Sequence, residues 1–187
     1  MARIGIPSAR KEMGEAAYAK ALAASSDSAR KRIARLGDFA KMDLPYGLDM
    51  WDGYPVDRER VYAAVKAAQA RAIVLAGDSH AFWVNELFDD AGARAGVEFG
   101  TTGITSPGGG DSLPTFPIGE VFAQANREVL FCDQNAKGFL LLTLTPNEAK
   151  ADLMAVSNIT EPIYDTRVVK TYRVTPEAGG LSAPTEV

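Results

Sequence analysis

Cysteine, histidine and long apolar runs are scarce in this chain of 187 residues, and each shortage excludes a class of protein. The single cysteine, Cys132, cannot form an internal disulfide, so the sequence leaves the redox compartment open. No stretch approaches the ~20 apolar residues that a membrane-spanning helix needs. The N-terminus has no long apolar core behind its first charges, so it does not resemble a secretory signal.

An excess of basic residues is missing as well. The net charge of -4 and the isoelectric point near 5.1 argue against a nucleic-acid-binding surface. They say little about a small anionic substrate, because a bound metal would dominate the charge of its site. Apolar residues make up 47% and charged residues 24%, as in soluble proteins with a packed core. The length fits one domain or part of a larger one.

The strongest local signal lies at residues 71–87, RAIVLAGDSHAFWVNEL. Five apolar residues, 72–76, end at Gly77, and this pattern predicts a short strand that is buried on both faces. Asp78 and His80, the only histidine, follow directly. Side chains two positions apart at a strand end can point in the same direction. A carboxylate and an imidazole placed in this way can share a metal ion.

Asp78 and His80 also have a simpler interpretation. An Asp after a strand is often a turn former, and a single His is often an ordinary hydrogen-bonded residue. A further alternative is that the two side chains merely hydrogen-bond to each other, without a metal. The spacing alone leaves both interpretations open, because short motifs also match by chance.

The other patterns predict an α/β chain. We expect helices at 11–24, 28–39, 58–70 and 118–127. We expect strands at 97–104, 128–132, 139–145, 149–156 and 167–174. Residues 82–87 predict a helix or a twisted segment. For the helix at 58–70, Asp57 is the expected cap, and the expected apolar stripe consists of Val61, Ala64, Val65 and Ala68.

Two further polar residues each have two interpretations. Asp52 lies in a loop at 41–55, where we expect Trp51 and Tyr54 to pack over the core. Its carboxylate either braces this loop or supports a metal site from behind the ligands. Asn85 either faces that metal site or serves as a hydrogen-bonding brace.

Two segments raise the question of anion binding. The helix at 28–39 has a basic face formed by Arg30, Lys31, Arg32 and Arg35, which is either simply solvated or an anion-attracting rim. The glycine-rich segment 108–112 can in principle cradle a phosphate through backbone N–H groups. It lacks the Lys of a P-loop, so a mobile lid or a plain flexible connection is the favoured interpretation.

Four blocks of the sequence resemble, in the same order, blocks of the PhoD-like alkaline phosphatase and phosphodiesterase family. GDSHAFWVNEL at 77–87 resembles the GDxHxxWxxEL block of that family. WDGYP at 51–55, followed by RER at 58–60, resembles its WDGYPxxRER block. VEF at 97–99 with ITSPG at 104–108 resembles its VEFxxxxxTSPG block. KGFLLLTLTP at 137–146 resembles its GYLLLxLTP strand.

The resemblance implies an α/β fold, the C-terminal portion of a metallophosphatase-type sandwich of two sheets with flanking helices. It implies a metal-dependent phosphoester hydrolase, with iron and calcium ions that activate a hydroxide and neutralise the phosphate. At the matching positions, Asp78 and His80 would be metal ligands. Members of the family are usually periplasmic or secreted.

The sequence departs from the family in its first part. Ligands that the family draws from its N-terminal half find no counterpart, and calcium alone prefers about 6–8 oxygens. We therefore expect an incomplete chain that forms a homo-oligomer or associates with a missing N-terminal part. The alternative is a non-catalytic binding or structural remnant. The expected layout is a helical segment at 1–43, the family region at 44–175 and a flexible tail at 176–187.

Overall fold

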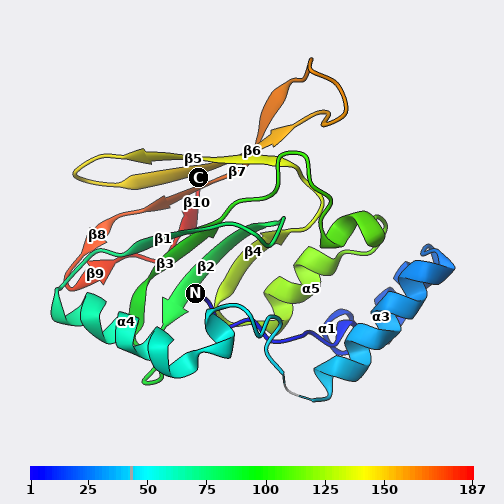
Figure 1. Cartoon of the computed structure of the whole chain (residues 1–187), viewed down its shortest axis with the longest axis horizontal. Helices are drawn as coiled ribbons and strands as arrows, with labels where there is room; N and C mark the ends of the chain where they lie inside the picture. The colour runs from blue at the N-terminus through cyan, green and yellow to red at the C-terminus, as the bar shows by residue number, and fades with distance from the viewer. Residues whose placement is uncertain (43) are drawn as a thin grey trace.

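Two four-stranded sheets stacked face to face form the framework of the protein (Figure 1). The computed structural model describes residues 1–42 and 44–187. Asp43, which belongs to the expected loop at 41–55 and ends the expected segment 1–43, lies outside the described residues. The α/β class predicted from the sequence is confirmed, with helices covering the outer face of one sheet.

The first sheet has the strand order β1-β3-β2-β4. Its strands are β1 Ile73–Ala76, β2 Phe82–Phe88, β3 Arg94–Gly100 and β4 Val129–Asp133. β1 runs parallel to β3, and the other pairs are antiparallel. The prediction of a helix or twisted segment at 82–87 is wrong, because these residues form the inner strand β2. Phe82 and Val84 face the second sheet, while Trp83 and Leu87 pack on the opposite side, so both faces of β2 are apolar.

Strand β1 exists where the sequence predicts it, but it is an edge strand and is not buried on both faces. The side chain of Leu75 is 59% exposed. Ile73 packs between the sheets, and Val74 packs on the opposite face. An unbroken apolar run therefore predicted the strand but not its place in the sheet, because an edge strand can also have two apolar faces.

The second sheet has the order β10-β7-β6-β5 and is antiparallel throughout. Its strands are β5 Gly138–Leu144, β6 Ala149–Val156, β7 Thr166–Val174 and β10 Thr185–Glu186. The first three match the strands expected there. Alternate residues of β6, Ala149, Ala151 and Leu153, face the first sheet and pack against Phe82 and Phe99. This alternation buries one face of β6 in the core between the sheets.

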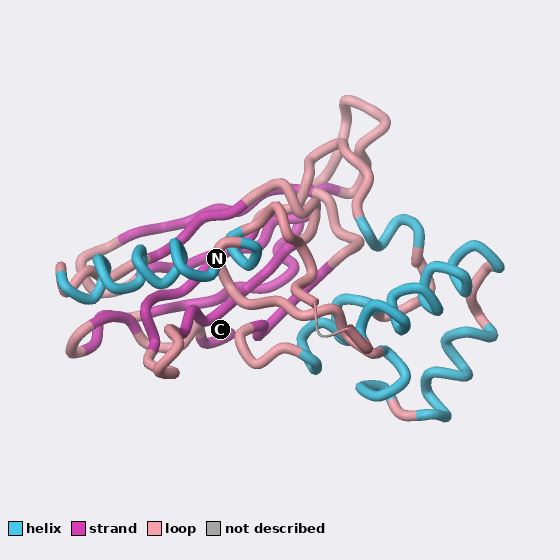
Figure 2. The backbone as a smooth tube through the Cα atoms, turned by 60° about the horizontal axis from the view of Figure 1, so that its bottom comes forward, coloured by secondary structure: helices cyan, strands magenta, loops and turns pink. Residues whose placement is uncertain are grey.

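The helices lie outside the sheets (Figure 2). They are α1 Ala9–Met13, α2 Glu15–Ala23, α3 Asp27–Ala40, α4 Pro55–Ala67 and α5 Ile118–Ala125, with short 3-10 turns η1 Trp51–Gly53 and η2 Gly109–Ser112. The single helix expected at 11–24 is divided at Gly14, whose φ of 76° interrupts it. The sequence offers Asp27 or Ser28 as the cap of the next helix. In the structure Ser26 caps α3 by accepting a hydrogen bond from the N–H of Ala29.

The loop before α4 and the helix itself differ from the expectation. Trp51 is 41% exposed and Tyr54 is 54% exposed, so these aromatics do not seal the core. The helix begins at Pro55, which suits a first helical position, and Asp57 lies inside it. Its buried residues are Arg58 and Tyr62 rather than the predicted alanine and valine stripe. Tyr62 packs with Leu87 and Ala95 of the first sheet.

The C-terminal residues differ from the flexible tail expected at 176–187. They form the hairpin of β8 Pro176–Glu177 and β9 Gly180–Leu181 and then β10, which pairs with β7. Leu181 is 8% exposed and belongs to the core between the sheets. Pairing of β8 with β9 and of β10 with β7 thus orders residues 176–187, although their composition is typical of a loop. Within the described residues, each helix is too short or too polar to cross a membrane.

Candidate active site

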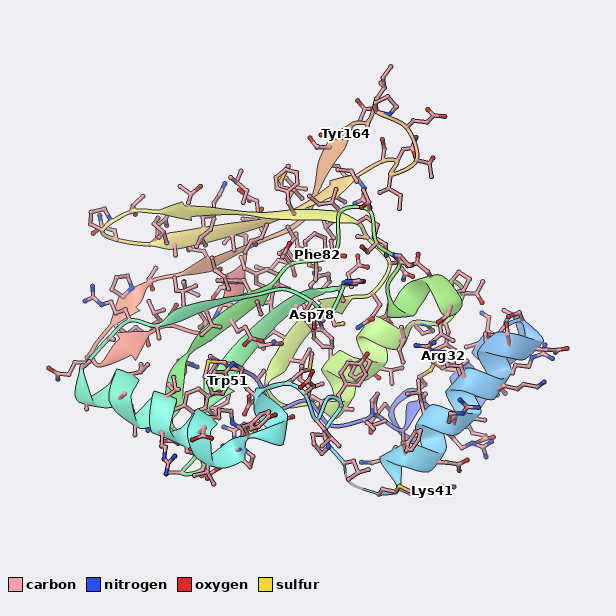
Figure 3. All side chains as sticks on the ribbon, in the orientation of Figure 1. Arg32, Lys41, Trp51, Asp78, Phe82 and Tyr164 are labelled. Atoms are coloured by element: carbon pink, nitrogen blue, oxygen red, sulfur yellow. The ribbon has the colours of Figure 1, made fainter. Side chains whose placement is uncertain are left out.

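The turn after β1 holds both predicted metal ligands in left-handed backbone conformations. Asp78 has a φ of 65° and His80 a φ of 54°. Between them, the N–H of Ser79 donates to the carbonyl oxygen of Gly77 at 2.8 Å. Figure 3 places Asp78 near the middle of the molecule. Such conformations cost about 1–3 kcal/mol per residue and occur preferentially at functional sites.

His80 is held by one ring nitrogen, which leaves the other for a ligand. Its Nδ1 lies 2.6 Å from the carbonyl oxygen of Pro107. A carbonyl oxygen can only accept, so Nδ1 carries the proton and Nε2 of the neutral ring has the lone pair. Metal-binding histidines usually have this arrangement, in which a carbonyl or carboxylate fixes the N–H that does not face the metal. The chemistry of His80 therefore fits a metal ligand.

The loop at 101–108 fixes the backbone of His80 as well as its ring. The hydroxyl of Thr102 lies 3.0 Å from the carbonyl oxygen of His80 and 2.8 Å from that of Ala136. Gly108 comes so close that a Cβ there would lie 2.6 Å from the same His80 oxygen. Glycine is needed at this position because any larger residue would displace the turn. Sequence reasoning missed these contacts, although Pro107 and Gly108 belong to the TSPG block.

Asp78 borders a mostly apolar cavity of about 170 Å³. Its side chain is exposed, and Trp83 lines the same cavity and donates from Nε1 to Ser79 Oγ at 2.9 Å. The carboxylates of Asp52 and Glu98 also line this cavity. The structure thus brings Asp78 and Asp52 together along one cavity, and it places His80 against the loop at 101–108.

Asp52 uses both carboxylate oxygens within the protein. Oδ2 accepts from the N–H of Ile4 at 2.8 Å, and Oδ1 accepts from the guanidinium of Arg58 at 2.5 Å. Arg58 is only 3% exposed, so this ion pair is largely shielded from water. The contacts are those of a brace that joins the N-terminal segment, the loop and α4. A role for Asp52 in supporting metal ligands stays a prediction.

Asn85 is completely buried in β2. Its Nδ2 donates to Glu98 Oε1 at 3.0 Å, and its Oδ1 has no hydrogen-bond partner among the described residues. The other carboxylate oxygen of Glu98 binds the amino group of Met1. Burial lowers the pKa of that amino group to about 6. Asn85 is thus grouped with Glu98 and Met1, and its role at a metal site also stays a prediction.

An ion pair that sequence reasoning missed anchors the glycine-rich segment 108–112. Asp111 Oδ2 lies 2.9 Å from Lys137 Nζ and also accepts from the N–H of Gly108. The Gly108 hydrogen bond and the Lys137 ammonium hold the pKa of Asp111 below its ordinary value. The segment is therefore a tethered 3-10 turn, η2, where the sequence favoured a mobile lid or a flexible connection.

The residues present fit a metal only in part. Asp78 and His80 have suitable donor atoms, but residues 1–42 and 44–187 contain no group of three or more His, Cys, Asp or Glu side chains arranged around one ion. Cys132 is buried, and burial raises the pKa of its thiol to about 12. Its Sγ accepts from Gln134 Nε2 at 3.3 Å, so it is an inert thiol rather than a thiolate ligand.

One metal-free interpretation has Asp78 and His80 hydrogen-bonded to each other. In the described part of the chain, no such bond joins them, and the His80 ring bonds to Pro107 instead. The geometry therefore supports a histidine prepared for a ligand over a self-contained Asp–His pair.

Comparisons with known proteins agree with the sequence blocks. A family model described as PhoD-like phosphatase matches residues 12–153. Alkaline phosphatase D of Bacillus subtilis (strain 168) is 34% identical over 122 residues, which cover 63% of this chain and 20% of that protein. The solved structure of PhoD matches with a TM-score of 0.59 and 27% identity, covering 76% of this chain and 28% of that one. The chain therefore spans less than a third of the length of these relatives.

Proposed function

This chain belongs to the PhoD-like phosphatase family, and we propose that it contributes metal ligands to a phosphoester hydrolase of the alkaline phosphatase and phosphodiesterase type. The observation that carries this proposal is the contact between His80 Nδ1 and the Pro107 carbonyl. It fixes the ring tautomer and leaves Nε2 as a donor for a metal. Asp78, two residues earlier in the same strained turn, adds a carboxylate.

In this proposal Asp78 and His80 are ligands of a metal centre, which by family resemblance contains iron and calcium ions. When bound, the metal would supply positive charge for the phosphate and would lower the pKa of a bound water. The protein's own contribution is orientation. The Pro107 carbonyl keeps the proton on Nδ1 and increases the basicity of Nε2, while Thr102 and Gly108 hold the backbone of His80 in place.

Two donors do not fill a coordination sphere, so the proposal includes further ligands from a second copy of the chain or from another part of the protein. Apolar residues on the outer face of the second sheet support such an association. Phe139 and Val168, respectively 38% and 49% exposed, flank Met154 in one cross-strand row. Tyr164 lies in the segment that projects beyond the sheets (Figure 3) and is 54% exposed, and Ile163 before it in the sequence is 85% exposed. Because large exposed apolar patches often mark interfaces, we place the proposed association on these surfaces.

A non-catalytic binding or structural role is the second candidate function. It is favoured by one observation, the lack of a third metal-binding side chain near Asp78 and His80 in the described residues. The two functions differ in what they predict for the isolated chain. Both allow a metal to bind, but only the first allows hydrolysis.

The experiment combines hydrolysis with metal binding. Release of p-nitrophenol from a phosphomonoester and a phosphodiester is measured with added iron and calcium, and metal binding is measured by calorimetry. The variants are His80→Ala, Asp78→Asn and, as a matched carboxylate change at an exposed position, Asp165→Asn. We expect His80→Ala to lower activity at least ~100-fold, since even the partners of metal ligands contribute 10–100-fold.

Three outcomes separate the hypotheses. Activity that falls in His80→Ala and Asp78→Asn, but not in Asp165→Asn, supports the hydrolase, and sedimentation then tests whether the active species is an oligomer. Metal binding without hydrolysis in every oligomeric state supports the non-catalytic role. Metal affinity that is equal in the parent chain and in His80→Ala contradicts the assignment of His80 as a ligand.

A further inference from the structure

A basic groove lies between α3 and η2, apart from the cavity beside Asp78. Its volume is about 520 Å³. Lys31, Arg32 and Arg35 line it from α3, and Asp111 and Ser112 line it from the other side. In Figure 3, Arg32 lies on α3 toward the edge of the molecule, whereas Asp78 lies near the middle. This concentration of positive charge stands out in a chain with a net charge of -4.

The periodicity of α3 places these cations on one face. Ser28, Lys31, Arg32 and Arg35 have the spacing i, i+3, i+4 and i+7, which forms a continuous stripe on a helix. The neighbouring face is anchored in the core, because Ala29 and Ile33 are 2% and 3% exposed. Burial of these two residues therefore fixes the rotation of the helix and directs the basic stripe to the groove.

The cations that line the groove differ from neighbouring cations of α3 in their ion pairing. Arg30 and Lys41 each pair with a carboxylate three residues earlier, at 3.3 Å and 2.9 Å. Over residues 1–42 and 44–187, no carboxylate lies within ion-pair distance of Lys31, Arg32 or Arg35. Asp111 is the acidic residue of the groove, and its charge is already compensated by Lys137 at 2.9 Å.

The groove and the candidate metal site share one loop. Asp111 and Ser112 border the groove, and the Asp111 carboxylate accepts from the N–H of Gly108. Gly108 in turn packs on the carbonyl of His80, and Pro107 binds the His80 ring. The same loop therefore contacts the turn that holds His80 and also borders the groove.

We propose that this groove is a second anion subsite, which binds additional phosphate groups of a ligand that carries several of them. The inference rests on the proposed function for the identity of the anion, because a phosphoester hydrolase acts on phosphate-bearing ligands. From Ser28 to Arg35 the stripe extends over about 10 Å of helix, at about 1.5 Å per residue, which is more than one phosphate covers. Arginine suits this role because its guanidinium can bind two phosphate oxygens at once.

The test measures binding without catalysis. The full chain, in buffer freed of metal ions, is titrated with tripolyphosphate, orthophosphate or citrate in a calorimeter. The test variant changes Lys31, Arg32 and Arg35 to Gln. The control variant changes Lys20, Arg60 and Arg167 to Gln, which alters the net charge equally at exposed positions outside the groove. Thermal unfolding of both variants confirms that they are folded.

We expect tripolyphosphate to bind the parent chain at least tenfold more tightly than orthophosphate, and the groove variant to lose at least tenfold in affinity. The control variant should change by less than twofold, and higher salt should weaken binding because the contacts are exposed. Equal losses in both triple variants, or equal affinity for tripolyphosphate and citrate, would overturn the proposal. His80→Ala should bind tripolyphosphate like the parent chain, so a failure of the hydrolase proposal remains distinguishable from a failure of this one.

Discussion

Two pairs of polar residues lie at or near the cavity beside β1, and they differ in how far their side chains are bonded within the protein. Asp52 and Glu98 are largely buried, and their oxygens bind Arg58, Ile4, Asn85 and the amino group of Met1. Asp78 and His80 lie in a left-handed turn, and the contacts that hold the turn are made by backbone groups and the neighbouring loop.

The difference separates residues that hold the fold from residues that can serve a ligand. A carboxylate whose two oxygens already bind groups inside the protein contributes to stability and has fewer lone pairs left for a metal. A residue held in a strained conformation by its surroundings costs stability, and the strain persists because the rest of the fold determines it. Substitutions on either side of this division should therefore differ in their effect on stability and on metal binding.

Arg58→Ala should be the most destabilising change. It removes the buried partner of Asp52 and leaves the carboxylate with one bond, to Ile4. Breaking a buried ion pair on one side costs about 3–5 kcal/mol. Urea denaturation of the parent and the variant measures the difference. Arg60→Ala is the control, because Arg60 pairs with Asp57 at an exposed position of the same helix. It should cost less than about 0.5 kcal/mol, and equal costs for the two variants would contradict the division.

Gly108→Ala should destabilise the protein by about 1–3 kcal/mol, as overpacking does. The added Cβ would lie 2.6 Å from the His80 carbonyl oxygen, so the turn or the loop must shift. Nitrogen NMR of the His80 ring should show a change in the tautomer signals. Gly77→Ala is the matched control, because a Cβ there meets nothing within 4 Å. An unchanged ring signal in Gly108→Ala would show that the loop does not fix the orientation of His80.

Asp78→Gly should raise stability by up to about 1 kcal/mol, because glycine adopts the left-handed conformation without strain. The same change should abolish the contribution of the carboxylate to metal binding. Gln69→Gly is the control, since Gln69 has a similar φ of 50° at the end of α4. It should gain stability without any change in metal affinity. A metal affinity that is the same in Asp78→Gly and in the parent would remove Asp78 from the site.

The fold could be predicted where local patterns and local pairing coincide. The strands at 139–156 form a hairpin of neighbouring segments, and the alternation of β6 reflects its one buried face. Strand β2 was missed because sheet and helices cover both of its faces, which removes the alternation. The tail was missed because strands of two residues carry almost no periodic signal. Their pairing, of β8 with β9 and of β10 with β7, is visible only in the structure.

The candidate site, like the fold, could be predicted from the sequence only where the signal is local. Asp78 and His80 could be found from the sequence because they are two residues apart after an apolar run. The contact that gives His80 its tautomer comes from Pro107, which is 27 residues away in the sequence. Asp52 and Asn85 were recognised as polar residues of interest, but only the structure shows that Arg58 and Glu98 bind them. Spacing along the chain cannot predict such partners, because the fold brings them together.

Glu128→Gln should have the smallest effect, and it tests whether every carboxylate near Arg3 must be charged. Burial raises the pKa of Glu128, against the opposing effect of its hydrogen bond from the Arg3 N–H and of the nearby guanidinium groups. The folded state therefore binds this proton more tightly than the unfolded state does. The protonation of Glu128 stabilises the folded state below the ordinary glutamate pKa, and this stabilisation is lost as the pH rises through the raised pKa.

Glutamine at position 128 keeps an acceptor for the Arg3 N–H, at 2.8 Å in the parent, and has no proton to lose. The stability of Glu128→Gln, measured by urea denaturation between pH 4 and pH 8, should thus fall less with pH than that of the parent, and it should differ by less than about 1 kcal/mol at neutral pH. Glu177→Gln, at an exposed position, should leave the pH profile of the parent unchanged. A larger loss at neutral pH would place Glu128 with Asp52, as a carboxylate whose charge the buried arginines require.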